Sequence, residues 1–267
     1  MENTKILMIG AGRMGEAIIS GLMKDENGYL GKITVANRSD KERLAVLNEL
    51  YGIHITDHWQ GEVEDHDVII LASPPHTQDE QLNELGKRVD GQLIITVAAG
   101  IDPTYMEKRL PEGTPVCWIM PNTAAQIGQS ISTYVYGRHV REIHRRKVSV
   151  ILDAIGFSEE LTEDQVHNLT AVTGSAPAFV YTFVEALEGA AVENGVTTDQ
   201  ARILVTKMLL GSAAMLDAGY DPKELISQVA SPGGSTAEGI KVLEREKFQE
   251  ILNKAVRATN QHARSQG

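Results

Sequence analysis

The chain has 267 residues, of which 42% are hydrophobic and 23% are charged, and its formal net charge is −11 at pH 7. This composition excludes a disordered or fibrous chain, and the negative charge disfavours nucleic acid as a partner because a polyanion repels an acidic surface. A chain of this length is typical of two domains.

Three features of the sequence bear on the cellular compartment. The first predicted element begins at Lys5, which leaves no room for a removable signal peptide, and the longest apolar runs are too short to cross a bilayer. The single cysteine, Cys117, excludes an intrachain disulfide, which is typical of a reducing compartment. We therefore expect a cytoplasmic protein without a membrane partner.

A glycine-rich loop connects the first predicted strand, Ile6–Ile9, to an amphipathic helix. In a strand, loop and helix of this kind, the first glycine permits a tight turn, the second lets the backbone approach a pyrophosphate, and the third lets the helix pack on the strand. The pattern predicts a bound nicotinamide dinucleotide, and an ordinary strand-to-helix turn is the alternative. The residues expected at the cofactor are Gly10, Gly12, Arg13, Met14 and Gly15.

The second predicted strand, Ile33–Ala36, ends in Asn37-Arg38-Ser39. A fold that binds NAD normally offers an acid near this position to the ribose 2′-hydroxyl, and no acid stands there. Arg38 is suited to pair with a 2′-phosphate, with Asn37 and Ser39 as hydrogen-bond donors, so this loop favours NADPH over NADH. A solvated loop arginine is the alternative.

Short apolar runs alternate with amphipathic stretches as far as about residue 156, as an α/β fold with a doubly wound parallel sheet requires. The runs 68–71 and 93–97 are continuously apolar, which is expected when helices cover both faces of a sheet. We therefore assign residues 1–158 to a Rossmann-type domain that binds the dinucleotide. The predicted strands are Ile6–Ile9, Ile33–Ala36, Val68–Leu71, Leu93–Val97, Val116–Met120 and Ser132–Tyr136.

Three further loops follow the carboxyl ends of predicted strands, where ligands bind in open α/β sheets. Small residues in these loops leave room for a flat ring. Asn122 is suited either to hydrogen-bond a nicotinamide amide or a substrate, or to form a structural turn of the Asx type. The additional cofactor contacts that we expect are Ala72, Ser73, Pro74, Ala98, Ala99, Gly100 and Asn122.

The second half of the chain has helix signals in place of strand signals. Thr162, Thr197 and Asp221 each begin a sequence that resembles a capping box. Residues 159–267 are therefore predicted to form an all-helical domain. Helices 176–193 and 199–218 are apolar on more than one face, which favours a homodimer or a higher homo-oligomer through this domain, and helices central to their own domain are the alternative.

A second glycine-rich loop, Ser231-Pro232-Gly233-Gly234-Ser235-Thr236, directly precedes a predicted helix. Consecutive glycines at a helix N-terminus direct several backbone N–H groups toward one point, which is a suitable site for a carboxylate. A plain connection between helices is the alternative, because proline and glycine are common in loops. The eight histidines are scattered, and only His54 and His58 share an i,i+4 spacing, so we expect no metal site.

Taken together, these segments resemble the pyrroline-5-carboxylate reductase family from the first strand to the last helix. The most specific match is the segment Val229–Thr236, which is followed by Gly239, Ile240, Leu243 and Glu244. Further matches are Met120–Thr123, Ala98–Ile101, Gly174 and Ser175 with Pro177, and Glu185–Leu187.

This resemblance implies reduction of the cyclic imine 1-pyrroline-5-carboxylate to L-proline, a step of proline biosynthesis, with NADPH or alternatively NADH as cofactor. It also implies that Thr236 is the catalytic residue, through a hydrogen bond to the ring nitrogen, and that the family dimerises through the helical domain. A substrate that arrives as the iminium supplies its own proton, which would explain why no catalytic acid is evident. The implied substrate-binding residues are Ser231, Gly233, Gly234, Ser235 and Thr236, with backbone N–H groups of Gly233, Gly234 and Ser235 on the carboxylate.

The chain departs from the family pattern after the third predicted strand, where Ser73-Pro74-Pro75 replaces the usual Val-Lys-Pro. Three alternatives stay open, of which the first and the third follow from departures such as this missing lysine, which would lie near the cofactor, and the second from the pairing of a Rossmann-type domain with a helical domain. The first is a paralogue that reduces a related imine. The second is a β-hydroxyacid dehydrogenase, for which Lys207 is the candidate catalytic lysine. The third is a non-catalytic regulator that binds NADP.

Overall fold

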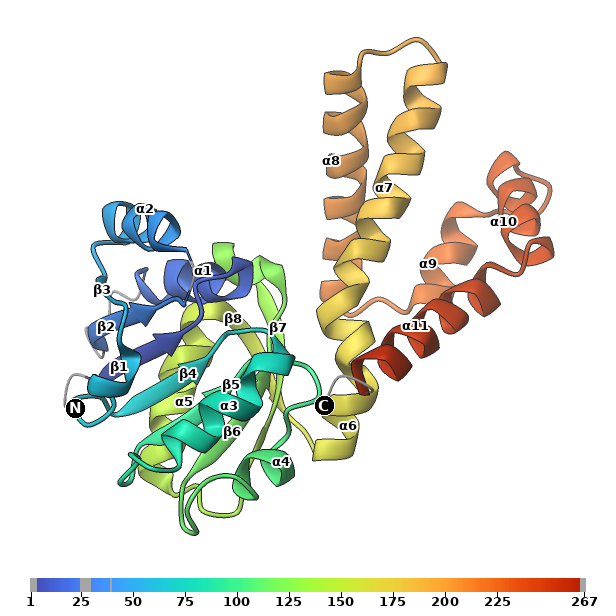
Figure 1. Ribbon diagram of the computed structural model, residues 1–267. Helices are drawn as coiled ribbons and strands as arrows, with labels where there is room; N and C mark the ends of the chain where they lie inside the picture. Colours follow the sequence, from blue (N-terminus) through green and yellow to red (C-terminus); the bar gives the residue numbers. More distant parts are fainter. Residues whose placement is uncertain (1–3, 25–29, 39, 265–267) are drawn as a thin grey trace. The chain divides into compact units, whose positions relative to one another are not determined.

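The computed structural model describes residues 4–24, 30–38 and 40–264 of the chain. The described residues belong to two compact units, which are coloured along the chain in Figure 1. Residues up to Ser175, together with those from Thr259 onward, make the first unit, and Ala176–Ala258 make the second.

The first unit is built on an eight-stranded sheet in the order β3-β2-β1-β4-β5-β6-β7-β8. Neighbouring strands are parallel except for β6 and β7. The strand order reverses between β1 and β4, and ligands bind at the carboxyl ends of the strands at such a point. The strands are β1 (Thr4–Ile9), β2 (Leu30–Ala36), β3 (His54–Thr56), β4 (Val68–Leu71), β5 (Leu93–Thr96), β6 (Val116–Met120), β7 (Ser130–Tyr136) and β8 (Gly156–Glu160).

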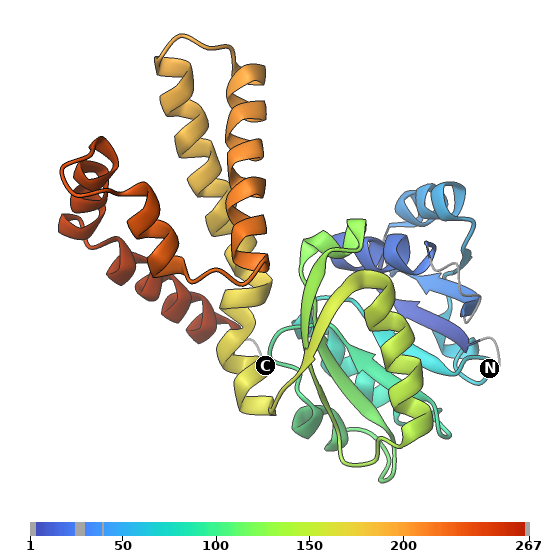
Figure 2. The same cartoon turned by 180° about the vertical axis from the view of Figure 1, so that it is seen from behind.

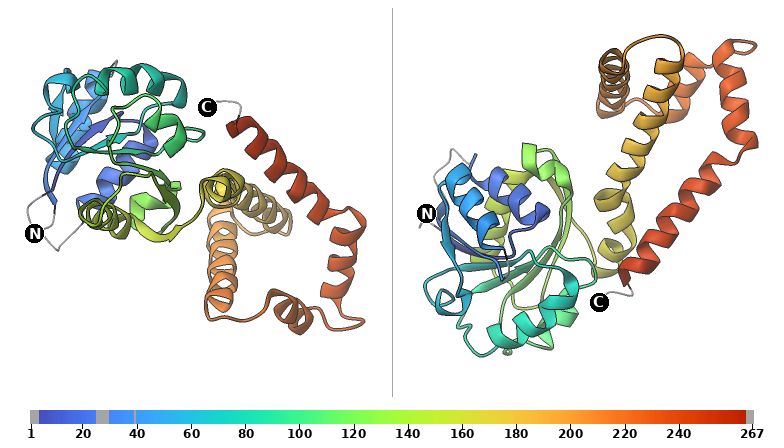
Figure 3. Two further views of the ribbon diagram at one scale, coloured as in Figure 1. Left: turned by 90° about the horizontal axis from the view of Figure 1, so that it is seen from below. Right: turned by 45° about the horizontal axis from the view of Figure 1, so that its top comes forward.

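Helices cover both faces of this sheet, as Figures 2 and 3 show from two further sides. Along β1, Ile6 and Met8 pack with α1, α2 and α5, whereas Leu7 and Ile9 pack with α3, α4 and α6. Successive side chains of a strand point to opposite faces, so a strand buried on both sides is apolar throughout. The helices are α1 (Arg13–Leu22), α2 (Lys41–Tyr51), α3 (Pro75–Leu85), α4 (Pro103–Glu107), α5 (Glu142–Ile155) and α6 (Glu163–Thr170), and the short helical turns are η1 (Trp59–Gly61), η2 (Thr123–Ile127) and η3 (Ala171–Ser175).

The predicted doubly wound fold is confirmed, and all six predicted strands are present with ends that differ by a few residues. Two strands were not predicted, because β3 is very short and β8 carries little apolar sequence. The sheet also contains one antiparallel pair, since β7 runs against β6. The connection between these two strands passes only through η2, which is too short for the crossover that a parallel strand needs.

The second unit consists of helices, and the predicted N-caps are confirmed. Thr162 of the first unit and Thr197 of the second form capping boxes with Gln165 and Gln200, and Asp221 accepts from the N–H groups of Lys223 and Glu224. Within the described part of the chain, no helix is both long and apolar enough to cross a membrane. The helices are α7 (Ala176–Glu193), α8 (Thr198–Asp217), α9 (Pro222–Val229), α10 (Ser235–Arg245) and α11 (Phe248–Arg264), whose last residues belong to the first unit.

The change from strands to helices and the division into compact units fall at different places. Strands end at Glu160, close to the predicted domain boundary between residues 158 and 159, and that boundary stays a prediction. The units divide later, at Ser175, because α6 still belongs to the sheet core: Val166 is fully buried in the cluster that contains Leu7 and Ile9.

Candidate functional site

The glycine-rich loop lies between β1 and α1, and its three glycines have three different surroundings. Gly10 has a φ of 116°, a conformation that favours glycine, and a Cβ at this position would lie 2.6 Å from the backbone of Ala72. A Cβ on Gly15 would lie 2.6 Å from the Gly10 carbonyl oxygen, whereas a Cβ on Gly12 would meet nothing within 4 Å among the described residues. These surroundings fit the turn, packing and phosphate-approach roles of a dinucleotide loop.

The N-terminus of α1 is suited to an anion. Gly12 is its N-cap, with no side-chain hydrogen bond to the helix from the residues described. The first N–H groups of a helix have no partner within the helix, and with the helix dipole they attract negative charge. A pyrophosphate that approaches Gly12 would therefore meet free N–H donors.

Arg43 of α2 anchors the same loop. Its Nε donates to the carbonyl oxygen of Ala11 at 3.4 Å, and its guanidinium pairs with Glu16 in the first turn of α1. Asp40 caps α2 by accepting from the N–H of Arg43 at 2.8 Å. Arg43 has no sequence signal as an anchor of this loop, because 27 residues separate it from Glu16 and no local pattern indicates such a contact.

A cleft of about 360 Å³ lies where β1, β2 and β4 end, a volume within the range of small-molecule sites. His76 and Thr77 also line the cleft and were not predicted. They directly follow the loop after β4 in the sequence, so their position in the chain could have indicated a place at the cofactor site. Trp59 comes from η1 and had no such signal. The predicted contacts that line the cleft are Gly10, Asn37, Arg38, Ser73 and Pro74.

Arg38 is the cation best placed in this cleft to meet a phosphate. Its side chain is exposed and has no ion pair with any residue in the described ranges. Two acids of the same cleft are already paired, Asp57 with Lys41 at 3.2 Å and Glu84 with Lys87 at 2.5 Å. Asn37 directs its Nδ2 to the carbonyl oxygen of Asp40 at 3.4 Å, and Ser39 lies outside the described residues.

The loops after β5 and β6 do not line this cleft. Trp118 holds the first of them, since its Nε1 donates to the carbonyl oxygen of Ala98 at 2.8 Å. Asn122 caps η2 by accepting from the N–H of Ala124 at 2.9 Å, and its Nδ2 donates to the Thr173 carbonyl oxygen at 3.1 Å. This is the Asx-type arrangement that was one of the two alternatives. Cofactor contacts by Ala98, Ala99, Gly100 and Asn122 stay a prediction.

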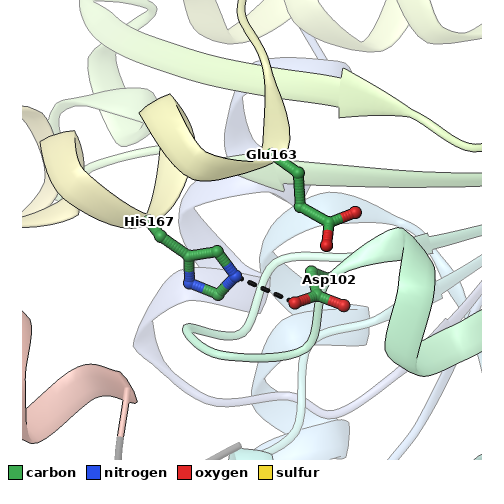
Figure 4. Close-up of side chains that lie close together, drawn as sticks. All are labelled: Asp102, Glu163 and His167. Atoms are coloured by element: carbon green, nitrogen blue, oxygen red, sulfur yellow. Dashed lines mark hydrogen bonds and ion pairs between the residues drawn. The ribbon is translucent and has the colours of Figure 1, made fainter.

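A cluster of one histidine and two acids lies next to the loop after β5, as Figure 4 shows. The Nε2 of His167 and the Oδ2 of Asp102 are 2.8 Å apart, and one ligand atom from each of Asp102, Glu163 and His167 lies within 4.8 Å of the others. Burial raises the pKa of Asp102, but hydrogen bonds from His167 and the Tyr105 N–H outweigh it, so the pKa is lowered. Burial and the Asp102 carboxylate raise the pKa of Glu163.

This cluster has a donor set that divalent metal ions accept, and no sequence pattern pointed to it. Glu163 and His167 are one helical turn apart in α6, but Asp102 lies 65 residues before His167. In the structure the hydrogen bond between Asp102 and His167 ties the N-cap of α4 to α6. It is therefore first of all a structural contact.

The second glycine-rich loop lies in the second unit, between α9 and α10. Gly233 has a φ of 78°, which favours glycine, and the Gly234 N–H donates to the Ser231 carbonyl oxygen at 2.9 Å. Gly234 is the N-cap of α10, and no side-chain cap is present among the residues described. The loop is solvent-exposed, and its last two residues, Ser235 and Thr236, are the first two residues of α10.

Comparisons with known proteins cover both units. Residues 5–100 match a family model described as NADP oxidoreductase, coenzyme F420-dependent, and residues 163–266 match one described as pyrroline-5-carboxylate reductase dimerisation. The chain is 34% identical over 258 residues to pyrroline-5-carboxylate reductase 1 of Bacillus subtilis, an alignment that covers 96% of this chain and 87% of the relative. The chain belongs to the pyrroline-5-carboxylate reductase family.

Further members of the family are similar to this chain along nearly its whole length. The pyrroline-5-carboxylate reductase of Mycobacterium tuberculosis is 33% identical over 279 residues, covering 95% of this chain and 94% of the relative. The solved enzyme of Streptococcus pyogenes has a TM-score of 0.90 at 30% identity, with 99% of this chain and 100% of that chain covered. The pyrroline carboxylate reductase of Plasmodium falciparum, solved with NADP bound, has a TM-score of 0.91 at 26% identity and covers 100% and 99%. The family resemblance seen in the sequence is confirmed.

Proposed function

We propose that this chain is an NADPH-dependent oxidoreductase that reduces the C=N bond of 1-pyrroline-5-carboxylate to give L-proline, and so belongs to proline biosynthesis. The observation that carries this proposal is the match to reductases of this name along 96% of the chain. Both glycine-rich loops lie within the residues that the two family models match. The reaction consumes the imine, NADPH and one proton, and it yields the amine and NADP⁺.

The cleft of the first unit is the proposed cofactor site. The nicotinamide supplies the hydride when the cofactor is bound. Gly12 and the N-terminus of α1 are assigned to the pyrophosphate, and Arg38 to the 2′-phosphate of NADPH. Arg38 is the basis for NADPH over NADH, because a 2′-phosphate has no counterpart in NADH. The other residues predicted to contact the cofactor, which include Arg13, Met14 and Gly100, complete the proposed site.

The loop before α10 is the proposed site for the substrate carboxylate. The Gly234 N–H already closes a turn onto Ser231, so we assign the carboxylate mainly to the N–H groups of Gly233 and Ser235. Thr236 is the proposed catalytic residue, with its hydroxyl as the hydrogen-bonding partner of the ring nitrogen. Reduction needs a protonated imine, and the iminium brings this proton to the site. Positioning then supplies much of the rate.

The second unit is the proposed dimer interface. Large apolar side chains on α7 and α8 are exposed in the single chain, for example Tyr181 at 62%, Ile203 at 61% and Leu204 at 58%. Exposed apolar surface of this extent is typical of a surface that a partner covers. The match of residues 163–266 to the dimerisation model points to a second copy of the same chain as that partner. We therefore propose a homodimer or higher homo-oligomer.

The proposal is tested by following NADPH oxidation with 1-pyrroline-5-carboxylate and by identifying proline as the product. Activity no greater than that without enzyme would refute it. Oxidation of 3-hydroxyisobutyrate with NADP⁺ would instead favour a β-hydroxyacid dehydrogenase, and binding of NADPH without turnover of any imine would favour a regulator. Thr236→Ala is expected to lower kcat/KM for the imine by about tenfold or more while the Kd for NADPH stays the same.

A further inference from the structure

Gln78 of α3 is completely buried beneath the loop that follows β4. Its Nε2 donates to the carbonyl oxygen of Ser73 at 2.9 Å and to that of Leu71 at 3.4 Å. A buried amide without partners is strongly unfavourable, so these hydrogen bonds favour one arrangement of the loop over α3. The side chain of Gln78 thus holds the backbone of Ser73.

The amide oxygen of Gln78 is bound by Thr96, the last residue of β5. The Thr96 hydroxyl is also completely buried, and it donates to Oε1 of Gln78 at 2.7 Å and accepts from the N–H of Ala98 at 3.2 Å. A hydroxyl has one donor hydrogen and two acceptor lone pairs, so it can make both bonds at once. Through these two side chains, the loop after β4 is connected to the loop after β5.

The loop that Gln78 holds forms part of the wall of the cofactor cleft. Ser73 and Pro74 line this cleft, whereas Gln78 and Thr96 do not. The same loop lies directly against the glycine-rich loop, because a Cβ on Gly10 would be 2.6 Å from Ser73 N. A displacement of the loop after β4 would therefore move the cleft wall and disturb the contact with Gly10.

We infer that Gln78 and Thr96 are positioning residues for the dinucleotide: they join the loop after β4, which lines the cofactor cleft, to the loop after β5, and so hold the cleft wall in one position. They act through Ser73 and Ala98, without contact to the ligand. The inference rests on the proposed function only in taking NADPH as the ligand.

The test is the affinity of the full-length protein for NADPH, measured by titration of the bound nucleotide's fluorescence without any imine present. Thr96→Val keeps the shape of the side chain and removes the hydroxyl together with both of its buried hydrogen bonds, to Gln78 and from the Ala98 N–H, and it is expected to raise the Kd about tenfold. Thr96→Ser keeps the hydroxyl and is expected to stay within about twofold of wild type. The pair separates the hydrogen bond from the volume of the side chain.

Gln78→Met tests the other end of the connection, because it fills the same space without the amide. If the two residues act together, the Kd of the Gln78→Met, Thr96→Val double variant equals that of the weaker-binding single variant, where independent effects would multiply. The kcat at saturating NADPH is expected to change less than the KM for NADPH in each variant.

Gln92 provides a matched control next to the other end of β5. It is also buried, accepts from the N–H of Asp90 at 2.6 Å and donates to the Val63 carbonyl oxygen at 3.4 Å, but it precedes β5, at the end opposite to Thr96. Gln92→Met is expected to lower the Tm about as much as Gln78→Met and to leave the Kd for NADPH unchanged.

The inference is overturned if Thr96→Val binds NADPH within twofold of wild type, or if Gln92→Met weakens binding as much as Gln78→Met does. It is also overturned if the wild type does not bind NADPH at all. A wild type that binds NADPH but does not reduce 1-pyrroline-5-carboxylate refutes the proposed function alone, since the Kd comparison does not depend on turnover.

Discussion

The carboxylate of Asp102 and the Nε2 of His167 lie 2.8 Å apart and tie the loop after β5 to α6. Both side chains are mostly buried, with 18% of Asp102 and 17% of His167 exposed. The His167 ring also packs on Trp118, with ring centroids 4.6 Å apart, and Trp118 in turn holds Ala98. The loop that carries three of the predicted cofactor contacts is therefore secured at both of its ends.

Asp102→Asn is expected to destabilise the protein in a pH-dependent way. The pKa of Asp102 is lowered in the folded state, so its carboxylate contributes stability that is fully present above the unfolded value of about 3.9 and is lost as the pH falls through the folded value. The variant should have a Tm about 2–4 °C below wild type at pH 7, and the difference should shrink below about pH 4. Thermal denaturation in EDTA over a pH series measures this. A difference that does not vary with pH would contradict the role of the charge.

Glu163→Gln is expected to have the opposite sign. The pKa of Glu163 is raised, so the folded protein binds more protons than the unfolded chain above about pH 4, and stability falls as the pH rises through this window. Gln keeps an acceptor for the Thr104 hydroxyl, 3.1 Å from the carboxylate, and it removes the repulsion with Asp102. We expect a Tm about 1–2 °C above wild type at pH 7 and no gain below pH 4.

Asp164→Asn is the control for this variant, because Asp164 is an exposed acid in the same first turn of α6. Loss of its interaction with the helix dipole should leave the Tm unchanged or slightly lower. A gain in Asp164→Asn as large as that in Glu163→Gln would point to net charge as the cause, in place of the local repulsion.

Gly10→Ala and Gly12→Ala are expected to fail in different ways. At Gly10 the positive φ and the backbone 2.6 Å away leave no room for a methyl group. We therefore expect the main effect of Gly10→Ala to be a lower Tm, with a smaller effect on the Kd for NADPH. At Gly12 the methyl group meets nothing within 4 Å among the described residues, so the Tm should be unchanged while the Kd for NADPH rises about tenfold or more. Denaturation and NADPH titration of both variants are the measurements. Unchanged binding in Gly12→Ala would remove the pyrophosphate from this position.

Arg38→Ala is expected to affect NADPH and leave NADH almost unaffected. A guanidinium that pairs with the 2′-phosphate makes charge-assisted hydrogen bonds, and their loss should raise the KM for NADPH about tenfold to a hundredfold. The KM for NADH should change less than about twofold, because NADH has no group for Arg38 to bind. Steady-state kinetics with both cofactors decide the matter, and an equal effect on the two would contradict the assignment.

Local signals determined much of this protein from its sequence. The apolar runs predicted six of the eight strands of the sheet, since a strand covered by helices on both faces must be apolar throughout. The glycine spacing predicted the turn at Gly10 and the open position at Gly12, and the capping residues Thr162 and Thr197 predicted helix starts. Each of these signals comes from residues within a few positions of one another, where backbone geometry limits the choice of residue.

Tertiary structure alone decided which distant residues meet. Asp102 and His167 are 65 residues apart, Thr96 and Gln78 are 18 apart, and Arg43 is 27 from Glu16. Such contacts depend on strand order and on which face of a helix meets the sheet, neither of which leaves a local trace in the sequence. The glycine-rich loop could be predicted because its geometry is local. The side chains that hold this loop and its neighbouring loops in place lie on helices and strands that are distant in the sequence and meet only in the folded protein.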